Sequence, residues 1–312
     1  MTETTKPASF DTDPSRKQAE GLWRVALGRL FRQRSAILGM ILLGLLVLAA
    51  IFAPLIAPYD PIQVLIGRED VKKRDPPCIH LLGCPEDRPQ HIMGIDGNVR
   101  DQFSRVIYGT RISLFIGFAT IGLAILAGAF LGSVAGYAGG FTSDAIMRVL
   151  DVVLAFPFLL LAIAIVAVLG PGLINAMLAI AVVNIPVYAR VMRSSVLSVK
   201  EEEYVVAARS IGSNPSRILR LHILPNSIPP LIVAATLGIG TAILETAALS
   251  FIGMGAQPPQ PEWGAMLASE RNQVFSAPHL VFFPGLAIMI TVLGFNLLGD
   301  GLRDALDPRL RL

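Results

Sequence analysis

The chain has 312 residues, of which 53% are hydrophobic and 16% are charged. An ordinary soluble domain has about a quarter of its residues charged, so this composition excludes that class. The formal net charge of +3 comes from basic residues scattered along the chain, not gathered in a stripe, which argues against a nucleic-acid partner. The composition instead predicts an all-α protein that crosses a membrane several times.

The N-terminal segment, residues 1–34, is predicted to be a cytoplasmic tail. Its first 20 residues are polar, and Trp23, Leu27 and Leu30 then fall on one helical face with arginines elsewhere. This pattern fits either a basic amphipathic helix on membrane lipid or a basic flank that orients the first span. The tail is too long for the n-region of a signal peptide, so the apolar run within 35–56 is predicted to be an uncleaved span.

Six apolar segments have the ~20-residue length that crosses a ~30 Å hydrocarbon layer as helix. They are 36–56, 112–135, 146–169, 173–191, 230–254 and 280–298. Pro157 is expected to kink the third. The second carries small residues at every fourth position, which predicts the close approach of another helix: Ala124, Gly128, Gly132 and Gly136.

The basic residues orient these spans. With the N-terminus inside, the cytoplasmic segments hold 17 Lys and Arg and the outer segments hold 9, eight of them in one long loop. The positive-inside rule therefore places both termini and residues 198–226 in the cytoplasm. The expected layout is an extracytoplasmic loop at 57–111, a five-span core at 112–300 and a cytoplasmic C-terminal tail at 301–312.

The outer loop contains the only two cysteines, Cys78 and Cys84, with a histidine between them. They could form a disulfide, remain free thiols or bind a metal, although no standard metal site has this spacing. Further along, Asp101 and Arg105 have the i,i+4 spacing of a helical ion pair.

Residues 198–226 are polar and are predicted to form two short helices with a hinge. Ser198 and Glu201 have capping-box spacing for the first helix, and Gly212 can end it. Asn214 followed by Pro215 is a typical start for the second, and Pro225 is expected to end that helix. The segment joins two spans directly, so it can transmit movement to both.

The sequence lacks the motifs of an energy-converting or hydrolytic site. It has no G-x-x-x-x-G-K-[ST] loop, no G-x-S-x-G turn and no H-E-x-x-H pair. Uphill transport would therefore need energy from a partner chain or from an ion gradient.

The run YVVAAR at 204–209, the following Gly212 and the later HILPN together resemble the "EAA" signature of membrane subunits of ABC-type importers. The match is most specific for C-type permeases of the dipeptide/oligopeptide branch, including its two departures from the general signature, Val206 and His222. The segments around His91 and Glu245, and the GAQPPQPEWGAML run, are similar to the same branch. The resemblance covers about 92–310 and, more loosely, 22–60. The residues that it assigns to an ATPase-coupling loop are Glu203, Tyr204, Ala207, Ala208, Arg209, Gly212, Asn214, Pro215, Leu224 and Pro225.

This resemblance implies a type I ABC importer permease fold in the cell membrane, serving as half of a pathway for peptides or related solutes. It also implies a second homologous permease, one or two ATPase subunits that bind ATP and Mg, and an extracytoplasmic solute-binding protein. The chain itself would carry no cofactor, no metal and no enzymatic site.

Glu245 is the one acidic residue deep in the fifth span, where an ionised carboxylate costs about 3 kcal/mol. It could form interhelical hydrogen bonds, line the pathway or relay protons. Asn184 and Asp151 are further candidates for the pathway or a gate, and Arg148 is spaced to neutralise Asp151. The proton role defines the alternative function, an ion-coupled secondary transporter, which would be expected to show the internal repeats that this sequence lacks.

Overall fold

The computed structural model describes residues 28–306, and regular structure within them is helical apart from isolated β-bridges in the outer loop. The all-α prediction is therefore confirmed. The proposed interfacial helix near Trp23 and the end of the C-terminal tail lie outside the described residues.

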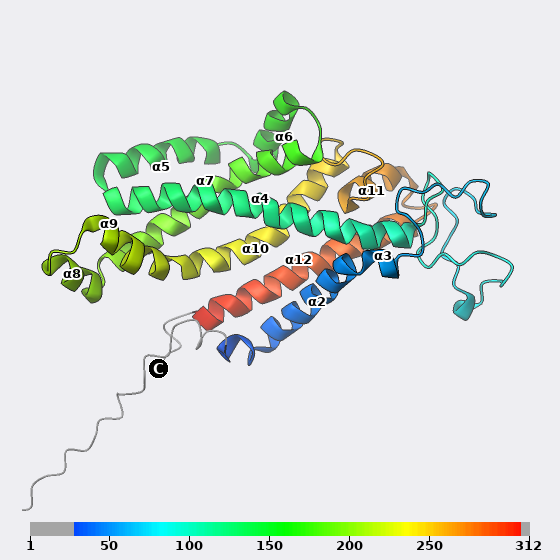
Figure 1. Cartoon of the computed structure of the whole chain (residues 1–312). Helices are drawn as coiled ribbons and strands as arrows, with labels where there is room; N and C mark the ends of the chain where they lie inside the picture. Colours follow the sequence, from blue (N-terminus) through cyan, green and yellow to red (C-terminus); the bar gives the residue numbers. More distant parts are fainter. Residues whose placement is uncertain (1–27, 307–312) are drawn as a thin grey trace, which may run out of the picture.

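Five helices, some with a short extension, are long and apolar enough to cross a membrane. They lie roughly side by side along the long axis of the molecule (Figure 1). Helix α2 is followed directly by the short α3, Ala53–Ile56. The five are α2 (Arg34–Ile51), α4 (Gln102–Ala138), α7 (Leu173–Lys200), α10 (Leu224–Phe251) and α12 (His279–Leu306).

The remaining predicted span is broken. Helix α5 (Gly140–Leu154) and helix α6 (Phe158–Leu169) meet at an angle of 89°. Pro157 is the N-cap of α6 and has an extended ψ of 127°. Helix α5 ends before it because a proline has no backbone N–H to donate and disfavours the helical conformation of the preceding residue. The expected kink at Pro157 is therefore a full break, and the count of six spans holds when this bent pair is one of them.

The small residues of α4 form its contact with α7. A Cβ added at Gly132 would lie 2.4 Å from the carbonyl oxygen of Ala189, and one at Gly128 would lie 2.7 Å from the Cβ of Tyr188. Gly136 meets Val196 in the same way, at 2.8 Å. Any side chain here would push the two helices apart, which confirms the packing predicted from the four-residue spacing.

Helix α2 packs along α12 (Figure 1). A Cβ at Gly39 of α2 would lie 2.7 Å from the backbone nitrogen of Leu298, and one at Gly301 of α12 would lie 2.5 Å from the Cβ of Ala36. Chain segments from the two ends of the sequence thereby close the bundle.

The outer loop is held by polar contacts. Cys78 and Cys84 are joined as a disulfide with a Cα–Cα distance of 5.4 Å, and Cys78 forms a two-way backbone pair with His91. His91 is only 3% exposed, and its ring nitrogens lie 2.8 Å from the Oδ1 of Asp101 and 3.1 Å from the Oε2 of Glu69. The loop is thus anchored to the start of α4.

The predicted Asp101–Arg105 ion pair is wrong. Asp101 is the N-cap of α4 and accepts a hydrogen bond from the backbone nitrogen of Ser104 at 2.7 Å. Arg105 turns instead to Asp96, at 3.4 Å, and donates to the carbonyl oxygen of Pro61. A capping carboxylate points along the helix axis to the free amides, so it does not lie along the helix side where an i,i+4 partner sits.

Candidate functional site

The candidate coupling loop lies at the opposite end of the bundle from the outer loop (Figure 1). It consists of α8 (Glu203–Ser210), α9 (Pro215–Ile218) and the π-helical turn η3 (Leu219–Ile223), between α7 and α10. The two-helix organisation predicted for 198–226 is therefore present, but both of its outer boundaries differ from the prediction.

The capping box predicted at Ser198 and Glu201 is wrong. Helix α7 continues to Lys200, so Ser198 is helical and its hydroxyl donates to the carbonyl oxygen of Ser194. Glu202 takes the N-cap position of α8 and makes no side-chain cap. Helix α7 packs on α4 as far as the buried Val196, and Lys200 then donates to the carbonyl oxygen of Tyr137 at the end of α4. Contacts with α4 therefore continue beyond Ser198 and support the longer helix.

The hinge is formed by the residues that the sequence indicated. Gly212 has φ of +75°, a left-handed conformation that suits glycine, and the amide of Ser213 bonds back to the carbonyl oxygen of Ala208. Asn214 then caps α9 by accepting from the backbone nitrogen of Ser216 at 3.0 Å, with Pro215 as the first helical residue.

Pro225 does not end the second helix. It occupies the first turn of α10, where its missing donor is tolerated, and residues Pro215–Phe251 form one continuous helical run. The π turn η3 precedes it, with the amide of Leu224 bonded to the carbonyl oxygen of Leu219. This wider turn absorbs the proline without breaking the helix, so α9 is covalently and helically continuous with the fifth span.

Four apolar side chains attach the loop to the bundle. Val205 and Ala208 of α8 and Ile218 and Ile223 beyond the hinge are all buried in the main hydrophobic core. Tyr137 at the end of α4 adds a polar attachment that sequence reasoning missed. Its hydroxyl donates to the carbonyl oxygen of Pro215 at 3.1 Å, and its own carbonyl oxygen accepts from Lys200.

One solvent-exposed face of α8, extended by its C-cap residue Ile211, carries a stripe of apolar side chains. Tyr204 is 42% exposed and Ile211 is 83% exposed, and the exposed Ala207 lies between them. Their i, i+3, i+7 spacing places them on one side of the helix, beside the buried face. Ile211 was missed by the sequence reasoning, although this spacing could have indicated it. Glu203 and Arg209 are exposed polar residues of the same helix, and Leu224 is half-buried at the start of α10.

A second polar site lies within the spans. The side-chain nitrogen of Asn184 donates to the Oε2 of Glu245 at 3.3 Å and to the carbonyl oxygen of Ile180 at 3.0 Å, joining α7 to α10. Both residues are half-buried. The structure thus brings together two of the three candidates for the pathway or gate.

Asp151 takes a different partner. It lies on α5 and forms an ion pair with Arg190 of α7, with a nitrogen–oxygen distance of 2.5 Å and both side chains 54% exposed. The predicted Arg148–Asp151 pair is therefore wrong. The break after α5 sets this helix beside α7, where Arg190 reaches the carboxylate across the helix contact.

No group of three or more His, Cys, Asp or Glu residues that could hold a metal is found in the described part of the chain. The arrangement is that of a helical membrane protein with a two-helix element, joined to a span at each end, outside the bundle. This arrangement fits the class of membrane transport components.

Comparison with known families agrees with this class. Residues 128–312 match the family described as "Binding-protein-dependent transport system inner membrane component", and residues 21–77 match the "N-terminal TM domain of oligopeptide transport permease C". The chain belongs to this family of inner-membrane transport components, which makes it a multi-pass membrane permease subunit of the ABC type. The ion-coupled secondary transporter considered for Glu245 is therefore the wrong alternative.

Several curated relatives cover nearly the whole chain. The dipeptide transport system permease protein DppC of Alkalihalophilus pseudofirmus is 48% identical over 93% of this chain and 90% of its own length. The di/tripeptide permease DppC of Pseudomonas aeruginosa is 44% identical over 89% of each chain. The glutathione transport system permease protein GsiD of Pectobacterium atrosepticum is 44% identical over 93% of this chain and 92% of its own.

Among solved structures, a chain of the MetNI methionine ABC transporter in an inward-facing conformation superposes with a TM-score of 0.55 at 19% identity. The match covers 64% of this chain and 96% of that one. At this identity the likeness shows the fold, which is the importer permease fold expected from the sequence.

Proposed function

We propose that this chain forms half of the solute pathway of an ATP-driven importer for di- or oligopeptides or related solutes such as glutathione. The solute class is supported by the names of relatives that cover 89–93% of the chain. In this proposal a second homologous permease supplies the other half, and an extracytoplasmic binding protein delivers the solute.

The observation that carries the proposal is the exposed apolar stripe of Tyr204, Ala207 and Ile211. Exposed apolar side chains of this kind mark contact surfaces, and this stripe lies on an element continuous with two spans. We assign the stripe to the contact with a separate ATPase subunit, of which the complex would have one or two. Those subunits would bind ATP and Mg, and this chain would bind neither.

The mechanical consequence follows from the two junctions. Helix α9 continues into α10 without a break, while α8 is linked to α9 through the left-handed turn at Gly212. A movement of the ATPase subunit against α8 would be transmitted through α9 to α10 as a rigid-body movement. The turn at Gly212 would meanwhile let α8 change its angle to α9. Asn184 and Glu245 join the moving α10 to α7, and we propose that they hold these two helices in register as a structural or gating pair.

The first experiment isolates the tagged full-length chain from its native membrane and identifies the proteins that co-purify. We expect a homologous permease and ATPase subunits. The complex in liposomes should import labelled dipeptide with ATP, and labelled glutathione serves as the competing solute. Uphill import by the chain alone would contradict the proposal, as would ATPase activity of the chain alone.

The second experiment tests the stripe directly. The double variant Tyr204→Ala, Ile211→Ser should lose the ATPase subunit during purification, because it removes the exposed apolar contact. Val206→Ser is the matched control, since Val206 is 47% exposed on another side of the same helix. Retention of the ATPase subunit by the double variant would place the contact elsewhere.

The proposed orientation needs its own measurement. With Cys78 and Cys84 replaced by serine, Ser210→Cys provides one exposed thiol on α8. A membrane-impermeant thiol reagent should label it in inverted membrane vesicles and leave it unlabelled in intact cells. The reverse pattern would put the coupling loop outside the cytoplasm.

A further inference from the structure

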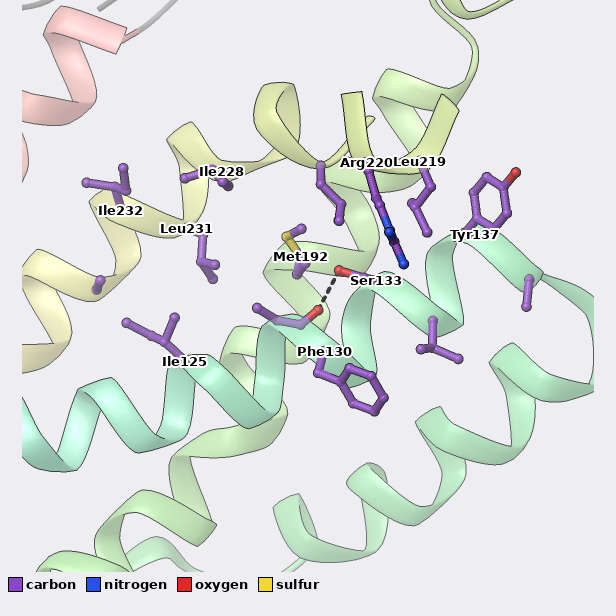
Figure 2. A pocket seen from close by; sticks show the side chains of 15 residues that line it. Ile125, Phe130, Ser133, Tyr137, Met192, Leu219, Arg220, Ile228, Leu231 and Ile232 are labelled. Carbon is purple, nitrogen blue, oxygen red and sulfur yellow. Dashed lines mark hydrogen bonds between the residues drawn. The ribbon is translucent and has the colours of Figure 1, made fainter. Parts of the chain in front are cut away.

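An apolar groove lies in the half of the bundle that carries the coupling loop. It has a volume of about 680 Å³ and runs between α4 on one side and η3 with α10 on the other (Figure 2). The buried Met192 of α7 closes it from behind in this view. The stripe assigned above to the ATPase contact, Tyr204, Ala207 and Ile211, does not line this groove.

The walls of the groove suit a hydrocarbon chain rather than a peptide. Ile125 and Ala129 line the α4 side, and Leu231 and Ala235 line the α10 side. The hydroxyl of Ser133 donates to the carbonyl oxygen of Ala129 within α4, as the dashed line in Figure 2 shows. A polar solute would lose its hydration here without gaining hydrogen bonds in return.

The length of the groove matches one leaflet. Along α4 it extends from Ile125 to Tyr137, and twelve residues of helix span about 18 Å. Half of a ~30 Å hydrocarbon layer is about 15 Å. Tyr137 contacts the coupling loop through Pro215, so the groove occupies the leaflet nearest that loop.

A positive charge lies at the loop end of the groove. Arg220 of η3 is exposed, and its side chain points toward α4 (Figure 2). None of the ion pairs found among residues 28–306 involves Arg220. Lys200 adds a second charge beside Tyr137, at 3.1 Å from its carbonyl oxygen. Basic residues at the mouth of an apolar pocket between spans are suited to an anionic headgroup.

We propose that the groove binds one acyl chain of an anionic phospholipid, with the lipid phosphate held by Arg220. Charge complementarity and the one-leaflet length both favour a lipid of the membrane that the chain already spans. Because η3 joins α9 to α10, a bound lipid would brace this turn against α4. The site does not depend on the proposed ATPase contact, so its test needs only this chain.

The test reconstitutes the full-length chain in vesicles of phosphatidylcholine doped with a photoactivatable phosphatidylglycerol, with the reactive group on the acyl chain. Peptide mapping should find the cross-links in 125–137 and 224–235. A photoactivatable phosphatidylcholine with the same acyl chain should label these segments several-fold less. Equal labelling by the two lipids would overturn the role of the charge.

Two variants separate the headgroup from the acyl chain. Arg220→Gln should lower phosphatidylglycerol labelling about fivefold, the change expected for one basic side chain near an anionic surface. Ala129→Phe should block labelling by both lipids because it fills the groove. Arg148→Gln is the matched control, an exposed arginine on α5 that does not line the groove, and should label like the unchanged protein.

A competing occupant is the second permease. If the groove residues cross-link to that chain in the co-purified complex and lipid labelling disappears there, the occupant is a protein and the proposal fails. Undiminished labelling of Arg220→Gln or of Ala129→Phe would also overturn it.

Discussion

Residues 57–101 and residues 201–223 lie at opposite ends of the bundle and are held in different ways. The outer segment is cross-linked by a disulfide, by the buried Asp96–Arg100 pair and by His91 between two carboxylates. The coupling loop is attached by apolar side chains and has a glycine hinge in its middle. One end is therefore held by covalent and ionic contacts, whereas the other depends on apolar contacts and a left-handed glycine turn.

The first prediction concerns the disulfide that cross-links residues 57–101. Replacing Cys78 and Cys84 with serine should destabilise the outer loop by about 2 kcal/mol in the loop-entropy description, or about 30-fold in its open fraction. Limited proteolysis within 57–101 should accelerate accordingly, and cleavage in 201–223 should not change. Mass spectrometry of unreduced peptides provides the control, since it should find Cys78 joined to Cys84 in the unchanged protein.

The second prediction concerns the left-handed turn at Gly212, between α8 and α9. Gly212→Val places a β-branched residue at φ of +75°, which costs about 1–2 kcal/mol, and should reduce ATP-driven uptake about tenfold. No atom lies within 4 Å of the added Cβ, so the effect arises from the backbone and not from a clash. Gly212→Asn is the matched control because asparagine tolerates this conformation. Normal uptake by the valine variant would show that the hinge conformation is dispensable.

The third prediction concerns the pH dependence of the contacts that His91 makes with Asp101 and Glu69. Burial alone would lower the pKa of His91, but its contacts with Asp101 and Glu69 outweigh burial and raise the pKa above 6.5. A histidine whose pKa is raised by folding adds stability that is fully present below the unfolded value and is lost as pH rises through the folded pKa. The outer loop should therefore be cleaved a few-fold faster at about pH 8.5 than at about pH 6.

His91→Gln tests this assignment, because glutamine keeps hydrogen-bonding capacity without titrating. The variant should be cleaved at the same rate at both pH values after correction for the protease's own pH profile. The pH dependence of cleavage in 201–223 serves as the internal reference. A pH effect that persists in His91→Gln would assign the titration to another group.

The smallest effect is expected between the two ends, at the Asn184–Glu245 pair. Glu245→Gln keeps an oxygen that can accept from Asn184, so uptake should change less than about twofold. Glu245→Ala leaves the Asn184 amide without this acceptor and should lower the free energy of unfolding by about 1 kcal/mol. A glutamine variant without transport would require the carboxylate charge itself.

The sequence predicted most of the bundle because hydrocarbon thickness and backbone hydrogen bonding constrain spans locally. Five of the six spans were located from apolar length alone. The four-residue spacing of small side chains predicted that another helix would pack closely on α4, and the structure shows that this helix is α7. The hinge was also predictable, since Gly212 and the Asn214–Pro215 pair determine backbone conformation through their own covalent structure. The broken α5–α6 span was indicated only as a kink at Pro157.

The tertiary structure decided which partners each polar residue takes. Asp101 caps its helix and contacts His91, and Asp151 pairs with Arg190. Pro225 lies in the first turn of α10, where the sequence predicted the end of a helix. The groove at Arg220 likewise combines residues of α4, α7 and α10 that are separated in the sequence. Such contacts depend on how the helices pack. A local pattern specifies which side chains of one helix could meet, but it does not specify which other helix packs against them.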